Sequence, residues 1–396
     1  MNCKLTLLGV LFFAITSLQS QEINSGEFGK GLFNIVGKDS SWTMKIGLRV
    51  QLQGASIWAK DQKNETTFLI RRSRLKFKGF TFSPKLKYKI ELGLSNRDQS
   101  GASVFTGNAP RYILDAVLIW NFYQNFELWV GQTKLPGNRE RIISSGNLQQ
   151  VDRSLLNSRF NIDRDFGVQL QHRFNITDQF IIKEIISLAQ GEGRNVTTGN
   201  LGGHQYTGRL ELLPFGDFSN KGDYKGADLK REKTPKLALA ASYDYNNNAV
   251  KTRSNQGSYM ETDTGFFETN ITTLFIDAMF KYKGFSFMAE YADRTADNPF
   301  ASNSDGTLTG DILQIGKGIN LQSGYLLKSN WEFSGRYTNV TLDKTVTNIN
   351  SEKQYTLGVS KYIVGQKLKI QSDLSYLNIA NTNNKVVYRI QCDIHF

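Results

Sequence analysis

Strict alternation of apolar and polar side chains is the feature that most constrains how this chain can fold. At the C-terminal end an apolar residue occupies every second position, namely Val386, Tyr388, Ile390, Cys392, Ile394 and Phe396. A period of two places these side chains on one face of a β-strand, whereas a helix would scatter them around its surface. The last residues therefore predict an amphipathic strand that ends on an aromatic side chain.

The same pattern recurs along the whole chain and predicts about sixteen strands. They lie at 42–53, 67–79, 85–95, 111–122, 126–133, 165–174, 180–190, 204–213, 236–246, 271–283, 285–292, 315–327, 331–340, 354–363, 368–376 and 386–396. No segment shows a sustained helical period. The last strand has one alternative, the edge of a secreted β-sandwich, but a fully amphipathic terminal strand ending on Phe is uncommon there and favours a barrel.

The hydropathy of this chain excludes one class of membrane protein and allows another. The mean hydropathy is -0.38, and after the first twenty residues the longest unbroken apolar run is five residues. A membrane-spanning helix needs about 20 apolar residues, so a helical membrane protein is excluded. A transmembrane β-barrel is not excluded, because its alternating strands average to a hydrophilic score.

The predicted connections fall into two classes. Those after even-numbered strands are mostly short, and those after odd-numbered strands are mostly long and rich in Gly, Asn, Asp and Ser. We therefore predict an all-β fold, a transmembrane antiparallel β-barrel of about 16 strands with long extracellular loops and mostly short periplasmic turns. The connection 214–235 is long where a short turn is expected. Either the strand count slips there, or the barrel carries a long loop at its inner end.

The chain divides into three predicted parts. We interpret residues 1–20 as a signal peptide, because Lys4 precedes an apolar stretch and small residues follow that stretch. Residues 21–40 form a Gly-rich leader without alternation, which we expect to be loosely ordered. A single barrel domain is predicted for 41–396, and its lone Cys392 allows no internal disulfide. A signal peptide followed by a β-barrel predicts the bacterial outer membrane as the location.

Positive charge is concentrated in one predicted hairpin. The net charge is +12, and residues 71–89 contain eight Arg or Lys and no Asp or Glu. A lipid-facing cation costs about 2–4 kcal/mol at mid-bilayer, so this row is expected to face the lumen. Rings of Arg and Lys are the device of anion and phosphate pores. The candidate anion-binding, pore-lining residues are Arg49, Arg72, Arg74, Lys76, Lys78, Lys85, Lys87 and Lys89.

The connection 134–164 is the longest well-defined loop, and it is both basic and partly apolar. We propose that it bends into the barrel and narrows it, since a long loop with internal apolar residues is more often folded than floppy. A lid on the surface is the alternative. The cations of this candidate constriction loop are Arg139, Arg141, Arg153, Arg159 and Arg164.

Five motifs follow one another along the chain: Gly29-Lys30-Gly31-Leu32, Ile70-Arg71-Arg72-Ser73-Arg74-Leu75-Lys76-Phe77-Lys78-Gly79, Asp115-Ala116-Val117-Leu118, Val130-Gly131-Gln132-Thr133-Lys134-Leu135-Pro136 and Arg164-Asp165-Phe166-Gly167-Val168-Gln169-Leu170. In this order they resemble the phosphate-selective porin O and P family. The chain departs from the family at Thr133, where an aromatic residue is usual, and at Gly137. The resemblance implies a homotrimer of sixteen-stranded barrels that passes phosphate or polyphosphate through a cation-lined pore. Phe396 resembles the terminal residue that the outer-membrane barrel-assembly machinery reads as an insertion signal.

The functional prediction is an outer-membrane porin with a water-filled, cation-lined pore for passive diffusion of small anions, phosphate or other oxyanions. A general low-selectivity porin and a closed structural or receptor barrel are the alternatives. We predict no enzyme activity, because none of the three His has a recognisable nucleophile and acid beside it. No metal site or cofactor motif is present. The expected partners are outer-membrane lipids and lipopolysaccharide, small inorganic anions and the assembly machinery, and no nucleic acid.

Overall fold

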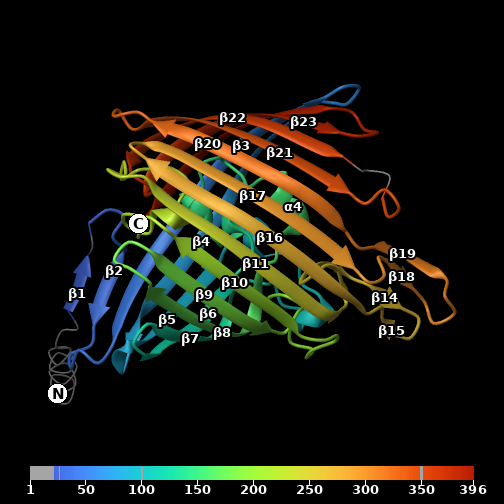
Figure 1. Cartoon of the computed structure of the whole chain (residues 1–396), viewed down its shortest axis with the longest axis horizontal. Coiled ribbons are helices and arrows are strands. Elements are labelled where there is room, and N and C mark those ends of the chain that lie inside the picture. The colour runs from blue at the N-terminus through green and yellow to red at the C-terminus, as the bar shows by residue number, and fades with distance from the viewer. Residues whose placement is uncertain (1–21, 26, 100, 348–350) are drawn as a thin grey trace, which may run out of the picture.

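The computed structural model describes residues 22–25, 27–99, 101–347 and 351–396. Sixteen antiparallel strands of these residues close into one barrel (Figure 1), which confirms the predicted fold. Closure is made by the last strand, which pairs with the first barrel strand from His395 opposite Arg49 to Lys385 opposite Ala59. The predicted signal peptide, 1–20, lies outside the described residues.

The barrel strands follow one another around the wall in chain order. They are β3 (Thr43–Ala59), β4 (Glu65–Thr81), β5 (Ser83–Gly93), β6 (Ile113–Tyr123), β7 (Phe126–Lys134), β8 (Arg164–Asn175), β9 (Ile181–Ala189), β10 (Gln205–Leu213), β11 (Lys236–Ala249), β16 (Thr269–Tyr282), β17 (Phe285–Ala296), β20 (Gly316–Leu326), β21 (Trp331–Leu342), β22 (Glu352–Val364), β23 (Leu368–Ile379) and β24 (Lys385–His395).

The two faces of each strand have the inverse of the burial seen in a water-soluble protein. In β24 the apolar Tyr388 and Ile390 are 39% and 44% exposed, while the polar Gln391 and Asp393 are 2% and 0% exposed. Apolar side chains therefore face outward, where lipid covers them, and polar ones face the interior. No helix among the described residues is long and apolar enough to cross a membrane.

The two ends of the barrel differ. One end, called the turn end, carries short connections such as the one between β4 and β5, together with the C-terminus. The other, the loop end, carries small hairpins of its own. They are β12 (Lys251–Arg253) with β13 (Gln256–Tyr259), β14 (Glu261–Thr262) with β15 (Gly265–Phe266), and β18 (Phe300–Ser302) with β19 (Leu308–Ile312). Figure 1 shows the last two of these pairs. A further loop at this end holds α2 (Asn96–Gln99) and η1 (Val104–Thr106).

The leader differs from the expected loose order. Two short strands, β1 (Glu22–Ser25) and β2 (Phe33–Val36), pair with each other, and β2 pairs with β3 from Val36 opposite Thr43 to Phe33 opposite Ile46. The physical reason is that β24 ends opposite Arg49 and leaves the start of β3 without a neighbour on that side. Backbone groups there need partners, and β2 supplies them.

The connection between β7 and β8 lies inside the barrel, as the constriction-loop hypothesis expected, and not as a lid on the surface. It contains α3 (Arg139–Ile142), η2 (Ser145–Asn147) and α4 (Leu155–Phe160). Its Leu156 and Phe160 are fully buried in a cluster with Phe275 of β16 and Val340 of β21, on the far wall. Apolar packing across the lumen thus holds this loop in place.

The connection 214–235 is a long loop at the turn end, so the strand count does not slip. It includes η3 (Gly222–Tyr224) and folds back into the barrel. Its Gly226 N–H donates to the carbonyl of Asn147 in the β7–β8 loop (2.8 Å), and Lys281 of β16 donates to its Lys225 and Ala227 carbonyls (both 2.8 Å). Two loops from opposite ends therefore meet inside the lumen.

Candidate functional site

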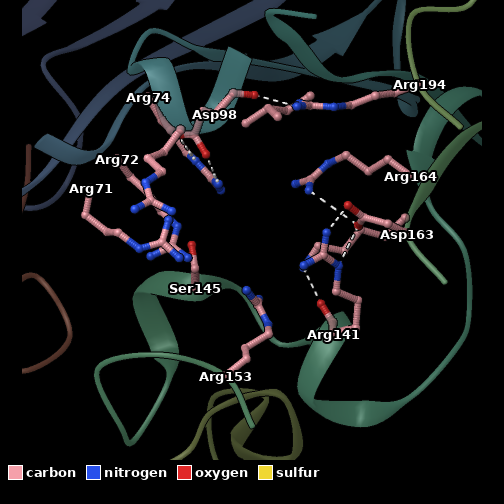
Figure 2. Close-up of a pocket in the computed structure, with 13 residues that line it drawn as sticks. Arg71, Arg72, Arg74, Asp98, Arg141, Ser145, Arg153, Asp163, Arg164 and Arg194 are labelled. Atoms are coloured by element: carbon pink, nitrogen blue, oxygen red, sulfur yellow. Dashed lines mark hydrogen bonds and ion pairs between the residues drawn. The ribbon is translucent and has the colours of Figure 1, made fainter. Parts of the chain in front are cut away.

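A cavity of about 210 Å³ lies between the β4 wall and the β7–β8 loop, and cations surround it (Figure 2). We call its lining the arginine cluster. Nine of the lining residues are basic and two are acidic: Arg71, Arg72, Arg74, Arg97, Lys134, Arg141, Arg153, Arg164 and Arg194, with Asp98 and Asp163. Strands β4, β6, β7 and β8, the helix α2 and two loops contribute to it, so no single segment builds the cluster.

A β-bulge brings two consecutive arginines of β4 into the cavity. The pairing of β3 with β4 shifts between Gln51, opposite Arg72, and Leu52, opposite Ile70. Arg71 is the extra residue of this bulge, so it and Arg72 both line the cavity instead of facing opposite ways. Strict alternation would have turned Arg71 away from the lumen, which is why the sequence-based prediction omits it.

The partners of these two arginines differ. The Nε and Nη2 atoms of Arg71 donate to Asp152 Oδ1 (3.2 and 2.9 Å). Arg72 donates to the neutral Gln51 Oε1 (2.7 Å), and its own ion pair with Asp152 is long, 4.0 Å. Burial opposes the charged form of Asp152, but the attraction of Arg71, Arg389 and Arg72 lowers its pKa to about 2. Asp152 is therefore an anion that anchors the loop to the wall.

Two other wall arginines are held by carboxylates. Arg74 donates to Asp98 from two nitrogen atoms (2.7 and 3.0 Å) and to Glu91 (3.0 Å). Arg164 donates to both oxygen atoms of Asp115 (3.1 and 3.2 Å). These contacts fix the guanidinium groups in rotamers that point into the lumen (Figure 2).

The cations of the loop face the wall cations across the cavity. Arg153 donates to the carbonyls of Glu140 and Ile143 (2.9 and 2.8 Å), which orient it without neutralising it. Arg141 pairs with Asp163. Burial lowers the pKa of Arg153 to about 10, and repulsion from Arg74 and Arg164 adds to that effect. Burial, with repulsion from Arg153 and Arg164, likewise holds the pKa of Arg141 well below its usual value. An anion in the cavity would relieve this repulsion.

A second cavity of about 410 Å³, called the inner chamber, adjoins the arginine cluster on the side of the turn end. Both cavities share Arg74, Lys134 and Arg164 in their walls. The chamber adds Lys76, Lys89 and Lys221 to these cations, the last from the 214–235 loop. A basic surface therefore continues from the arginine cluster toward the turn end.

The structure brings together only part of the predicted set. Arg72, Arg74, Arg141, Arg153 and Arg164 line the arginine cluster, and Lys76 and Lys89 line the inner chamber. Lys87 pairs with Glu127 (3.6 Å), and Lys78 and Lys85 are exposed nearer the turn end.

Three predicted pore-lining or constriction arginines are placed differently, and none of them lines either cavity. Arg49 is 2% exposed and donates to Asp393 and to Ser145 of the loop (2.8 Å). Arg139 is fully buried against Asp277 (2.6 Å). Arg159 pairs with Glu352. Each binds a carboxylate from a distant strand, which sequence reasoning does not reveal. These arginines hold the loop against the wall.

Four basic residues of the cluster were absent from the predicted set: Arg71, Arg97, Lys134 and Arg194. Lys134 ends β7 and donates to the carbonyls of Arg141, Ile142 and Ile143 (2.6, 3.1 and 3.2 Å). Arg97 and Arg194 come from loop-end connections. Only for Arg71 was a local signal present in the sequence, because the alternation breaks where two arginines are adjacent.

The family model for phosphate-selective porin O and P matches residues 44–388. The chain belongs to this family. It is an outer-membrane β-barrel channel protein of bacteria. A protein of Aquifex aeolicus (strain VF5), described as uncharacterized, is 22% identical over 411 residues, which cover 96% of this chain and 94% of that protein.

Solved porins share the fold of this family member. The anion-selective porin from Comamonas acidovorans is 11% identical, with a TM-score of 0.58 over 90% of this chain and 100% of that chain. The in-vitro folded OmpT of Vibrio cholerae, in its trimer form, is 12% identical with a TM-score of 0.53, over 89% of this chain and 99% of that chain. At these identities the likeness concerns the fold alone.

Proposed function

We propose that this porin passes small anions by passive diffusion and prefers oxyanions, phosphate among them. The observation that carries the proposal is the arginine cluster, whose lining has nine basic and two acidic side chains. Like charges this close destabilise one another unless an anion neutralises them. Arg offers a planar fork of donors that matches tetrahedral oxyanions, so the cluster suits phosphate or sulfate better than chloride.

The arrangement also allows an anion to leave. Several cations already have carboxylate or carbonyl partners, so an entering anion competes with Asp98, Asp163 or Asp115 and meets moderate sites in sequence. Binding that is favourable but divided among several sites is what conduction requires. A volume of about 210 Å³ also leaves room for several waters at about 30 Å³ each, so the anion keeps part of its hydration.

The oligomeric state and the remaining partners belong to the same proposal. The trimer form described for the Vibrio cholerae OmpT supports a homotrimer. Outer-membrane lipids, lipopolysaccharide and the barrel-assembly machinery are the partners that such a barrel meets. Phe396 directly follows the closing strand and is proposed as the insertion signal. Its N–H donates to Leu48 O (2.8 Å), and its ring contacts Phe28 edge-on.

Planar-bilayer recordings test the proposal. In a KCl gradient we expect a reversal potential of the sign that marks anion preference. Phosphate and then sulfate, titrated against chloride, should block the chloride current at lower concentrations than nitrate does. Cation preference would overturn the proposal. Equal permeability to both ions would indicate a general low-selectivity porin, and absence of conductance would indicate a closed structural or receptor barrel.

A further inference from the structure

The inner chamber is lined by aromatic and apolar side chains as well as by cations, and an inorganic anion gains nothing from contact with the apolar ones. We propose that the chamber binds organic oxyanions in which the charged group is carried on a ring. The oxyanion group would lie on the cations shared with the arginine cluster, and the ring would lie against Trp129. The inference rests on the proposed anion preference and specifies a substrate class for it.

Trp129 is the first observation. It lies on β7 between Leu128 and Val130, whose side chains belong to the outer face, so its own ring points into the lumen and lines the chamber. The ring is half-buried, not sealed in a core. Its indole N–H already donates to Glu127 (3.0 Å). What Trp129 offers to a ligand is therefore the face of the ring and not its hydrogen-bond donor.

Tyr224 extends this surface from the 214–235 loop. Its hydroxyl donates to Glu211 (2.7 Å), and Lys183 and Arg139 lie 5.0 and 5.8 Å from its ring centroid. These contacts lock the ring in one orientation, so little side-chain entropy remains to be lost when a ligand binds. Leu135, Pro136 and Ile142 of the β7–β8 loop complete the apolar wall.

The cationic wall of the chamber has a surplus of charge. Glu91, which is 2% exposed, accepts from Arg74 (3.0 Å) and faces Lys76 (3.1 Å) and Lys89 (3.8 Å). Arg74 also pairs with Asp98 (2.7 Å) and Lys89 with Asp115 (2.9 Å), so these three cations share three carboxylates. The residues that line the chamber include six cations and two acids: Arg74, Lys76, Lys89, Lys134, Arg164 and Lys221, with Glu91 and Glu127.

Size and composition agree with an organic ligand. The chamber, at about 410 Å³, is roughly twice the volume of the arginine cluster and falls in the range of small-molecule sites, about 300–1,000 Å³. Such sites combine apolar and aromatic walls with a few charged groups that fix orientation. Stacking of a planar ring on an aromatic side chain also tolerates variation in the ring, which suits a channel.

Two phosphate monoesters of equal charge provide the test. Phenyl phosphate carries a ring and methyl phosphate does not. In planar bilayers we expect phenyl phosphate to halve the chloride current of the wild-type channel at about one-tenth of the methyl phosphate concentration, a ratio equivalent to about 1.4 kcal/mol. Trp129→Leu should reduce this ratio to about two, because the apolar volume remains but the ring face is lost.

Trp120→Leu is the matched control. Trp120 lies on the neighbouring strand β6, is 50% exposed and belongs to the outer face, so its loss should leave the ratio unchanged. If Trp129→Leu does not assemble, Tyr224→Leu should lower the same ratio. Equal block by both esters in a wild-type channel that keeps its anion preference would overturn this inference and leave the proposed function standing. If Trp129→Leu leaves the ratio of the two half-blocking concentrations unchanged, this inference is also overturned. If the wild-type channel shows no anion preference, the proposed function itself is overturned.

Discussion

Replacing Arg72 with Gln removes one charge from the arginine cluster. Among the arginines that line the cavity from the wall strands, Arg72 has the weakest ion pair with a carboxylate. Arg72 is 5% exposed, donates to the neutral Gln51 and lies 4.0 Å from Asp152. Gln at this position can still meet Gln51, so the β3–β4 pairing is expected to survive. The effect should therefore be electrostatic.

The magnitude follows from Coulomb's law. Two unit charges 4 Å apart interact by about 1 kcal/mol in water and by about 4 kcal/mol at the effective dielectric of a protein surface. The cluster is a hydrated cavity, so we take the lower part of this range, about 1–2 kcal/mol for a bound anion. Loss of Arg72 should then raise the half-blocking phosphate concentration by about 5–30-fold.

The assay is phosphate block of chloride current at about 0.1 M ionic strength, where the Debye length is about 10 Å. Arg173→Gln is the control, because it makes the same change in net charge at an exposed turn-end position paired with Asp217. Arg72→Lys keeps the charge but not the planar fork, and it should fall between wild type and Arg72→Gln. A shift below two-fold for Arg72→Gln, or an equal shift for Arg173→Gln, would refute the assignment of selectivity to the cluster.

Three further perturbations test how the loops are held. The pKa of Asp152, about 2, lies below its usual value of 3.8. The ionised carboxylate therefore stabilises the attachment of the loop to the wall by about 2 kcal/mol. This stabilisation is complete above pH 3.8 and is lost as the pH falls toward 2. Conductance noise should rise over that window, and Asp152→Asn should show it at every pH. Gly226→Ala places a Cβ 2.6 Å from the backbone nitrogen of Gln149, so the two lumen loops should separate and single-channel conductance should increase; unchanged conductance would contradict this. Asp277→Asn removes a carboxylate partner from the buried Arg139 and Arg209. This should reduce the stability of the barrel by about 3–5 kcal/mol and lower the temperature at which the folded band disappears on a gel. The exposed control Asp217→Asn should leave that temperature unchanged.

The local alternation of apolar and polar residues was sufficient to predict the strands of the barrel wall. Each strand meets lipid on one face and water or polar groups on the other, so its alternation is set by surroundings that every residue meets directly. The predicted segments at 42–53, 126–133 and 386–396 correspond to β3, β7 and β24. The long connection 214–235 was also recognisable as an exception, although its path into the lumen was not.

The membership of the arginine cluster depended on contacts between distant strands and loops, and no local sequence pattern encodes such contacts. Arg49 and Arg139 are as basic as Arg72, yet Asp393 and Asp277 from distant strands neutralise them. Arg71 enters the lumen because a bulge breaks the alternation that otherwise governs β4. Which cations stay available to an anion is thus decided by the partners that closure of the barrel brings near.

The sequence by itself determined the class of fold, the facing of the strands and the concentration of basic residues in 71–89. The fold class and the facing follow from the two-residue period and from the high cost of placing a cation in lipid. Only the tertiary structure decided which charges surround one cavity and which ring faces them. Two loops from opposite ends of the barrel must meet before Arg153 and Tyr224 become neighbours of β4 and β7, and that meeting depends on packing across the lumen.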